Sequence, residues 1–301
     1  MPVRWQAVMD RAVEVVADLR GRGVRPTVRT VFYSLASTGH IPLTRSAYQC
    51  LCRHFVTARK EGRATWDGIS DETRRAEGGD NGYYDPVAYG KWWVDYVLNA
   101  DRKYALPRWK DQPGRVEVWL EKFALADTFR NWLECLNVAL VPSRGYASWT
   151  LIWEAALRLR ETAKPTVILY FGDFDPSGAD IQRFLKEALE GFNVEAEVRR
   201  VAVTKEQVEA YRLPYAPEDA AEAAKLQRDP RFRTWPFGLY RVELDALLAL
   251  QPDEFRRLVE ESVNEHFDQA VYARVRTEEA EAKRVVRETV WASLRRRLGG
   301  P

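Results

Sequence analysis

Four short apolar runs alternate with stretches of helical periodicity between residues 115 and 211, and this alternation constrains the fold more than any other feature. The apolar runs lie near 115–120, 137–142, 166–172 and 196–203. The helical stretches lie near 122–135, 148–162, 178–190 and 205–211. Strands that alternate with helices form βαβ units, and such units build a mainly parallel sheet. The sequence therefore predicts an α/β domain.

Acidic residues stand directly after the first and the third of these runs. Glu121 follows the first run, and Asp173 and Asp175 follow the third. The carboxyl ends of strands in an open α/β sheet line the ligand crevice, so we expect the three carboxylates to meet there. Carboxylates held together repel one another unless a cation joins them, and Mg²⁺ prefers hard oxygen ligands. We predict a Mg²⁺ site, with Mn²⁺ as the alternative ion, and metal-assisted chemistry on a phosphate ester.

The segment around the two Asp residues supports this site. Asp173 and Asp175 are two residues apart, so in an extended chain they point to the same side and can reach one cation. Pro176 favours a turn, and Gly178 permits a close approach to a ligand. The alternative is that the Asp residues only cap the helix that begins near Gly178. Capping accounts for one Asp but not for two together with Glu121.

Three helices are predicted in residues 1–75. The first ends at Gly21, the second opens after Thr27, and the third is capped by Thr44. The stretch 63–69 is predicted as a short wing strand. Three helices and a wing outline a winged helix, in which the third helix enters the major groove of DNA. Winged helices also serve as protein–protein modules, and this second role stays open.

Basic residues on the third predicted helix favour DNA as the partner. The expected DNA contacts on it are Arg45, Arg53, Arg59 and Lys60. Residues 1–110 hold 18 Lys and Arg against 12 Asp and Glu, whereas residues 111–301 hold 28 against 32. The more positive part is the one expected to touch a polyanion. Ordinary surface variation is the alternative account of so small a difference.

Composition shifts predict three parts along the chain. They are a DNA-binding domain at 1–75, a linker and helix at 76–112, and a metal-binding domain at 113–301. The polar, Gly-rich stretch 74–85 is typical of a linker, and a helix is predicted over 87–103. Within the last part, residues 213–236 are predicted to be irregular and residues 252–298 to be helical.

The general composition indicates a cytoplasmic protein. A length of 301 residues allows two modest domains. No apolar run is long enough to span a bilayer, and charges within the first eleven residues argue against a signal peptide. The cysteines are Cys50, Cys52 and Cys135. This sparse, odd set predicts neither a disulfide framework nor a zinc ribbon.

Four short motifs resemble one known family. Glu121-Lys122-Phe123-Ala124 resembles the Glu-Lys-x-Ala that follows the first strand of the Toprim domain in the A subunit of topoisomerase VI and its meiotic relatives. The turn Ser143-Arg144-Gly145-Tyr146 resembles the Gly-Tyr turn after that family's second strand. Residues 172–178 are similar to its Asp-x-Asp-Pro-x-Gly signature. Arg29-Thr30-Val31-Phe32-Tyr33 resembles the upstream Arg-x-x-(aromatic)-Tyr motif, whose last Tyr attacks DNA.

The resemblance implies a winged helix followed by a Toprim domain, with a helical C-terminal part. It implies Mg²⁺-dependent cleavage of double-stranded DNA, in which Tyr33 attacks the phosphodiester and forms a 5′-phosphotyrosyl link. Arg29 and Glu121 would assist, and Arg144 would contact a phosphate. A homodimer is implied, because in the family each active site joins the Tyr of one chain to the metal of the other. ATP-driven strand passage would require a separate ATPase chain, and the location would be at the nucleoid.

Two other functions fit the same residues. A hydrolytic Toprim nuclease would use water in place of Tyr33, and no protein–DNA adduct would then form. A non-catalytic DNA-binding adaptor would keep the fold without cleavage. Tyr33 itself follows Phe32 on an amphipathic helix, where a Tyr is often a core residue.

Overall fold

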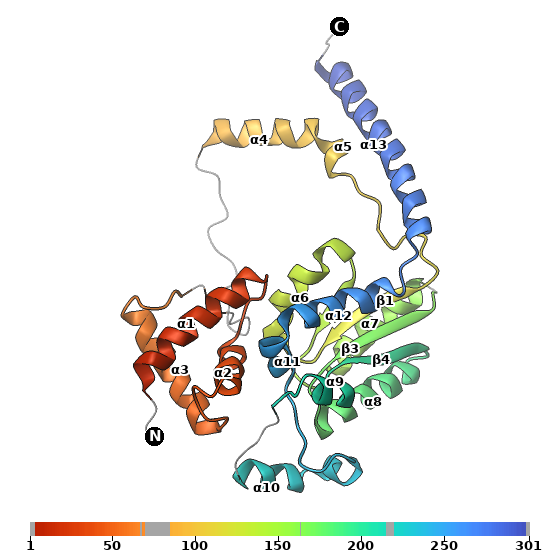
Figure 1. Cartoon of the computed structure of the whole chain (residues 1–301). Helices are drawn as coiled ribbons and strands as arrows, with labels where there is room; N and C mark the ends of the chain where they lie inside the picture. The colour runs from red at the N-terminus through yellow and green to blue at the C-terminus, as the bar shows by residue number, and fades with distance from the viewer. Residues whose placement is uncertain (1–3, 67, 70–84, 163, 215–219, 299–301) are drawn as a thin grey trace. The chain divides into compact units, whose positions relative to one another are not determined.

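The computed structural model describes residues 4–66, 68–69, 85–162, 164–214 and 220–298. The chain divides into two compact units, which are described separately (Figure 1). Unit 1 comprises Met1–Arg74 and Gly114–His266, and unit 2 comprises Arg75–Pro113 and Phe267–Pro301. The predicted linker at 74–85 lies outside the described residues except for Asp85.

A four-stranded parallel sheet forms the centre of unit 1, which confirms the predicted α/β class. Its strands are β1 (Arg115–Leu120), β2 (Ala139–Pro142), β3 (Thr166–Phe171) and β4 (Ala196–Ala202). Their order is β2-β1-β3-β4, and all neighbouring pairs are parallel. In the register of the sheet, Val118 lies opposite both Leu140 and Leu169. The ends of β1 and β3 are therefore direct neighbours.

Helices cover both faces of this sheet. In chain order they are α6 (Ala126–Leu133), α7 (Trp149–Thr162), α8 (Pro176–Gly191), α9 (Lys205–Ala210), α11 (Leu244–Leu250) and α12 (Pro252–Asn264). Short 3-10 turns at Phe123–Leu125 and Glu134–Leu136 flank α6. On one face, α7 and α8 pack over Trp119 and Tyr170. On the other, Phe129 of α6 and Phe255 of α12 pack against Phe171. Side chains that alternate along each strand thus fill two separate apolar layers.

The three predicted N-terminal helices are present in unit 1 as α1 (Trp5–Gly21), α2 (Val28–Ser37) and α3 (Arg45–Lys60). The hydroxyl of Thr27 accepts a hydrogen bond from the backbone N–H of Thr30, and the side chain of Thr30 accepts one from Thr27 in return. Thr44 caps α3 through a single hydrogen bond from the N–H of Ala47. Both caps satisfy N–H groups that a helix leaves open at its start, and the one at Thr27 and Thr30 is reciprocal.

The predicted wing strand is wrong for the residues that the structure describes. Between residues 63 and 69 the described positions form turns and bends, with no strand among them. The backbone N–H groups of Arg63 and Ala64 bond back to the carbonyl of Ala58, at distances of 2.8 and 3.2 Å. The chain therefore closes the end of α3 at this point, and these N–H groups are not available to a ladder.

The segment 213–236, predicted to be irregular, contains a helix. It holds α10 (Ala220–Arg228) and a 3-10 turn at Pro230–Thr234. Four alanines lie within α10, and alanine is the strongest helix former. The prolines of the segment, which suggested irregular structure, all lie outside α10.

Unit 2 is built from two distant stretches of the chain. It contains α4 (Pro86–Leu98), α5 (Ala100–Lys103) and α13 (Gln269–Leu298). The predicted helix at 87–103 is therefore present with a break at Asn99. Arg287 donates two hydrogen bonds to one carboxylate oxygen of Asp101, at 2.6 and 2.8 Å, and so joins α13 to α5. The helical C-terminal part is confirmed as α12 and α13.

A bilayer-spanning helix is not found among the described residues, because none of their helices combines the necessary length with sufficient apolarity.

Candidate functional site

Glu121 and Asp173 come together where β1 and β3 end. The N–H of Glu121 still bonds to the carbonyl of Phe171, at 2.9 Å, so the two chain segments leave the sheet side by side. One carboxylate oxygen of Glu121, Oε2, accepts a hydrogen bond from the hydroxyl of Tyr170 at 2.8 Å and another from the N–H of Asp173 at 3.0 Å. The sequence prediction that these acids share one edge of the sheet is therefore consistent with the geometry.

Two glycines allow the backbone to close in around these acids. A Cβ on Gly172 would overlap the carboxylate of Glu121 and the ring of Tyr170. A Cβ on Gly178 would overlap the carbonyl oxygen of Asp173. Only glycine fits at either position without a shift of its neighbours. The close approach predicted at Gly178 is thus an approach to the backbone of Asp173.

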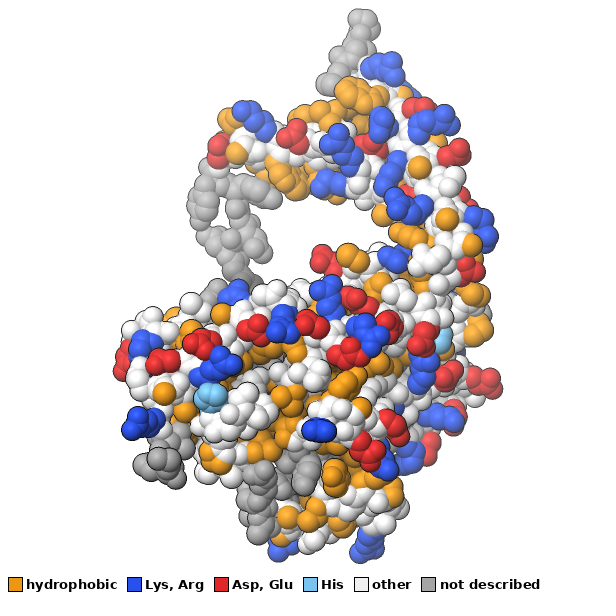
Figure 2. All heavy atoms as spheres, in the orientation of Figure 1, with side chains coloured by type: hydrophobic (Ala, Val, Ile, Leu, Met, Phe, Trp, Pro, Cys, Tyr) orange, Lys and Arg blue, Asp and Glu red, His pale blue; other side chains and the backbone are white. Residues whose placement is uncertain are grey.

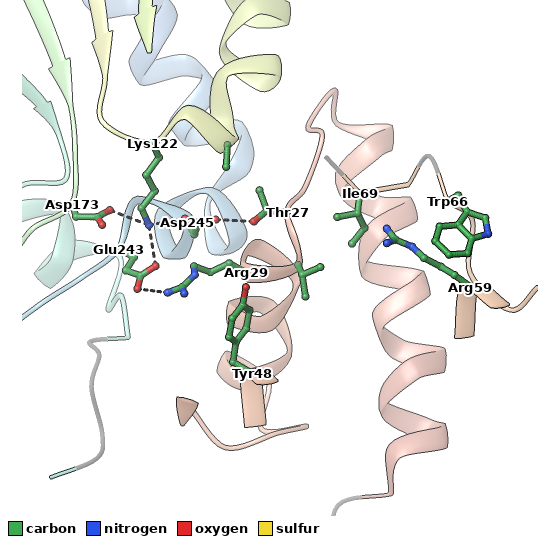
Figure 3. Close-up of a pocket in the computed structure, with 12 residues that line it drawn as sticks. Thr27, Arg29, Tyr48, Arg59, Trp66, Ile69, Lys122, Asp173, Glu243 and Asp245 are labelled. Atoms are coloured by element: carbon green, nitrogen blue, oxygen red, sulfur yellow. Dashed lines mark hydrogen bonds and ion pairs between the residues drawn. The ribbon is translucent and has the colours of Figure 1, made fainter. Parts of the chain in front are cut away.

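The ammonium group of Lys122 lies among three carboxylates (Figure 3). Its Nζ is 3.2 Å from Asp173 Oδ1, 2.9 Å from Glu243 Oε2 and 2.7 Å from Asp245 Oδ2. Burial acts to lower the pKa of Lys122, but the three carboxylates raise it well above its usual value. The lysine is therefore held as a cation and serves as an internal counter-ion for this acidic group.

The same neighbours shift the acids in opposite directions. Burial raises the pKa of Asp173 to about 8, even though the Lys122 ammonium acts to lower it. Burial also acts to raise the pKa of Glu243, but Lys122 and Arg29 together hold it at about 2. Glu243 is thus the fully ionised member of the group, whereas Asp173 is the one that resists ionisation.

Asp175 begins α8. Its Oδ1 accepts a hydrogen bond from the N–H of Gly178 at 2.6 Å, so it is the N-cap of that helix. Asp173 instead accepts a bond from the N–H of Leu244, the first residue of α11, at 2.7 Å. The capping alternative thus describes Asp175, while Asp173 is tied to Lys122 and α11.

The acids offer oxygen donors for a cation, although they are not grouped around one as they stand. Within the described part of the chain, no set of three or more Asp, Glu, His or Cys side chains is placed to hold a metal ion. Burial raises the pKa of Glu121, and the charge of Asp175 raises it further. Carboxylate oxygens that repel one another suit a divalent cation, so the chemical type of these ligands fits Mg²⁺.

Arg200 supports this edge from β4, and sequence reasoning did not identify it. Its Nη1 donates to the carbonyls of Gly172, Asp173 and Val203, at 3.1 to 3.2 Å. Its guanidinium carbon lies 5.1 Å from the centre of the Tyr170 ring. Arg200 therefore fixes the turn that carries Asp173 and packs on the tyrosine that holds Glu121.

Tyr33 is buried, with 2% of its surface exposed. Burial raises its pKa far above the usual value for a phenol. The expected helper, Arg29, donates to Glu243 Oε1 at 2.5 Å and lies 4.8 Å above the ring of Tyr48. In this arrangement the hydroxyl of Tyr33 is not open to solvent.

Helix α2 is joined to α11 by buried hydrogen bonds. The hydroxyls of Thr27 and Thr30 both donate to Asp245 Oδ1, at 3.0 and 3.1 Å. Asp245 is 2% exposed, and its other oxygen faces Lys122. The start of α2, the helix that carries Tyr33, is therefore joined to the acidic edge by one polar network.

A cavity of about 790 Å³ opens onto this network (Figure 3). It is lined by Thr27, Val28, Arg29, Tyr48, Arg59, Trp66, Ile69, Lys122, Ala124, Asp173, Glu243 and Asp245. Arg59, one of the expected DNA contacts, lies in this lining over Trp66, with its guanidinium carbon 5.5 Å from the ring centre. The cavity thus has Arg29 of α2 beside the carboxylates at the sheet edge, while Arg59 of α3 lines it near Trp66.

The other expected DNA contacts are on the surface. Arg45, Arg53 and Lys60 are exposed on α3, as is Arg144 after β2. Arg144 lies over the ring of Phe123, with its guanidinium carbon 5.0 Å from the ring centre. These side chains are accessible to a phosphate backbone.

Sequence reasoning missed Tyr48, Asp245 and the buried role of Lys122. Asp245 lies two residues after Glu243, in the first turn of α11. Tyr48 carried no motif, and its position facing the cavity follows from the packing of α3 against α2.

No protein-family model matches the sequence, and no curated protein is similar enough to be identified as a relative.

Proposed function

We propose that this protein cleaves duplex DNA in a reaction that depends on Mg²⁺ or Mn²⁺. The observation that carries the proposal is the convergence of Glu121 and Asp173 at the ends of β1 and β3, with Asp175 two residues further along the chain. The same unit carries exposed cations on α3 that suit a phosphate backbone. In this proposal α1–α3 act as a helical DNA-binding domain and the sheet as a Toprim domain.

In this proposal Glu121, Asp173 and Asp175 would hold the metal ion. When bound, the ion would neutralise the scissile phosphate and stabilise the leaving oxygen. Tyr170 and Arg200 orient the acids, since they bond to Glu121 and to the turn at Asp173. Lys122 offsets the charge of Glu243 and Asp245 and also faces Asp173, so Glu121 and Asp175 are the proposed ligands that are not paired with it.

The nucleophile is proposed to be Tyr33, by the resemblance of its motif. Its phenol would lose its proton and form the new bond to phosphorus, while the bond to the 3′ oxygen breaks and that oxygen takes up a proton, so bonds and protons balance. Because Tyr33 is 2% exposed, this attack requires the contact between α2 and α11 to open. A second chain, as the resemblance implies, would then supply the metal edge, and an ATPase chain would be needed for strand passage.

The burial of Tyr33 favours a second candidate, in which a water molecule attacks the phosphate. Hydrolysis needs the acids and the DNA-binding cations but leaves Tyr33 in its core position. The α2–α11 contact then stays closed during the reaction.

A covalent-trap assay tests both candidates. Supercoiled plasmid is incubated with the protein and Mg²⁺ or Mn²⁺, stopped with denaturant, and analysed with and without protease. Protein-linked breaks that are lost in Tyr33→Phe would support the transesterase, with Tyr211→Phe as the matched control because Tyr211 bonds to Glu254 outside the site. Breaks without an adduct would support hydrolysis. The absence of any break in the presence of DNA binding would favour the adaptor.

Glu121→Gln is the second variant of this assay. It should abolish cleavage in either chemistry while the protein still binds DNA. Cleavage at the wild-type rate would rule out the sheet edge as the site.

A further inference from the structure

Helix α4 exposes an unusual amount of apolar surface. Of its thirteen residues, all of them described, none is buried. Seven large apolar side chains on it are between 37% and 63% exposed. They are Val87, Tyr89, Trp92, Trp93, Val94, Tyr96 and Val97. A helix with this composition is normally found in a core or an interface, because exposed apolar area is costly in water.

The neighbouring helix of the same unit extends this surface. Trp291 of α13 is 47% exposed. Between the two helices runs an apolar groove of about 720 Å³, lined by Trp93, Val94, Val97, Leu98, Trp291, Leu294 and Arg295. Figure 2 shows hydrophobic side chains along α4 and near the C-terminal end of α13. The exposed residues and the groove therefore form one continuous surface, here called the α4 surface.

The size of the α4 surface matches one side of a protein interface. Large side chains that are about half exposed leave roughly 90 Å² each, so the seven on α4 and Trp291 together offer on the order of 700 Å². A standard interface buries about 800 Å² on each partner, whereas the largest apolar patch on a typical monomer is about 300–600 Å². The surface is thus large enough for a stable complex.

Charge identifies the kind of partner. Within α4 only Lys91 and Asp95 are charged, and they are opposite in sign and one turn apart. The groove adds Arg295 to this pair, and so small an excess of positive charge does not suit the phosphates of nucleic acid. Helices that lie on membranes carry a polar face rich in Lys and Arg, and α4 has a single Lys. Interface centres, by contrast, are rich in Trp and Tyr and poor in charge.

We propose that the α4 surface is the contact between two copies of this chain. Two copies related by a twofold axis bring identical surfaces together, so each covers the exposed side chains of the other. The neutral helix causes no repulsion with itself, and Lys91 of one copy can face Asp95 of the other in an antiparallel pair. This inference concerns unit 2 alone and does not depend on DNA cleavage.

The test is the mass of the full chain in solution, measured by sedimentation equilibrium over a range of concentrations. The wild type is expected at twice the chain mass of 34.8 kDa. Trp93→Glu should weaken association at least about 30-fold, as expected when a central aromatic residue is lost. Trp149→Glu is the matched control, because Trp149 is 60% exposed on α7 of unit 1. It should leave the dimer intact.

A photocrosslinking amino acid at Val94 provides a second, independent measurement. It should give covalent dimers, whereas the same group at Trp149 should not. A wild type that stays monomeric at about 100 µM, near the weak end of specific association, would overturn the proposal. A dimer that persists in Trp93→Glu, or one lost equally in Trp149→Glu, would overturn it as well. So would a monomer whose α4 residues become protected only on adding anionic vesicles or DNA.

Discussion

The sheet edge and the α4 surface depart from the usual division between an apolar core and a polar exterior, and they do so in opposite directions. At the sheet edge, Lys122 and Asp245 are charged groups withdrawn from water. On α4, Trp93 and Val94 are apolar groups left in water. Each arrangement costs free energy in an isolated chain. The comparison teaches that the buried charges of the sheet edge are stabilised by ion pairs and hydrogen bonds within the chain. The exposed apolar side chains of α4 require a partner.

The largest expected effect is at Lys122. Lys122→Met removes the buried ammonium that faces three carboxylates, while Glu243 keeps its ion pair with Arg29 and Asp245 keeps its hydrogen bonds from Thr27 and Thr30. Breaking a buried ion pair in this way should lower the free energy of unfolding by about 3–5 kcal/mol. Urea denaturation measures it, with Lys205→Met as the control, because the pair of Lys205 with Glu209 is exposed. A loss below about 1 kcal/mol, the range of surface pairs, would show that the lysine is not the counter-ion of this site.

Glycine substitutions compare the two regions directly. Gly172→Ala places a methyl group against Glu121 and Tyr170, and such overpacking should cost about 1–3 kcal/mol. Gly90→Ala on α4 meets no atom within 4 Å and should stabilise the helix by about 0.5–1 kcal/mol. Thermal unfolding of the two variants should therefore shift in opposite directions. Shifts of the same sign would contradict the close packing described at the sheet edge.

The contact between α2 and α11 gives a smaller effect. Thr30→Val keeps the shape of the side chain but removes its hydrogen bond to Asp245 and its part in the helix cap. The expected loss is about 1–2 kcal/mol. Thr57→Val on α3 is the control, since its exposed hydroxyl bonds only to the carbonyl of Arg53 in its own helix. Equal denaturation midpoints for the two variants would show that the bond to Asp245 adds nothing.

The smallest effect is expected on α4. Val94→Ala should change the stability of the dilute, monomeric chain by no more than about 0.5 kcal/mol, because Val94 is 57% exposed. The same change at Val259, which is fully buried in α12, should cost about 2 kcal/mol. Urea denaturation at low protein concentration measures both. A large loss at Val94 would mean that α4 is covered within its own chain.

Local patterns predicted the elements of the sheet domain well. The strands lie within two residues of their expected positions, because apolar runs bounded by turns are a local signal. Thr27 and Thr44 were identified as helix starts for the same reason. Two local predictions were wrong. The segment 213–236 contains α10, because its four alanines favour a helix more than the flanking prolines disfavour one. The wing strand is not formed at the described positions, because the N–H groups after α3 bond to the carbonyl of Ala58.

The candidate site was predictable only in part. Glu121 and Asp173 meet because β1 and β3 are neighbours, which a parallel sheet suggests. Two partners of Lys122, Glu243 and Asp245, lie more than 120 residues further along the chain, and no spacing rule links them to it. Arg200 likewise reaches back 27 residues to the turn at Asp173. Contacts of this kind follow from the packing of whole helices and strands, so a local sequence pattern does not predict them.

The bond between Asp101 and Arg287 has a consequence for the order of synthesis. It joins two stretches of chain that lie on either side of the entire sheet domain in the sequence. During translation, more than 180 further residues are added after Asp101 before its partner Arg287 is made. The sheet can close in that time, but the groove beside α4 is completed last. A ribosome that stops early would therefore release a chain with a folded sheet and no finished surface for pairing.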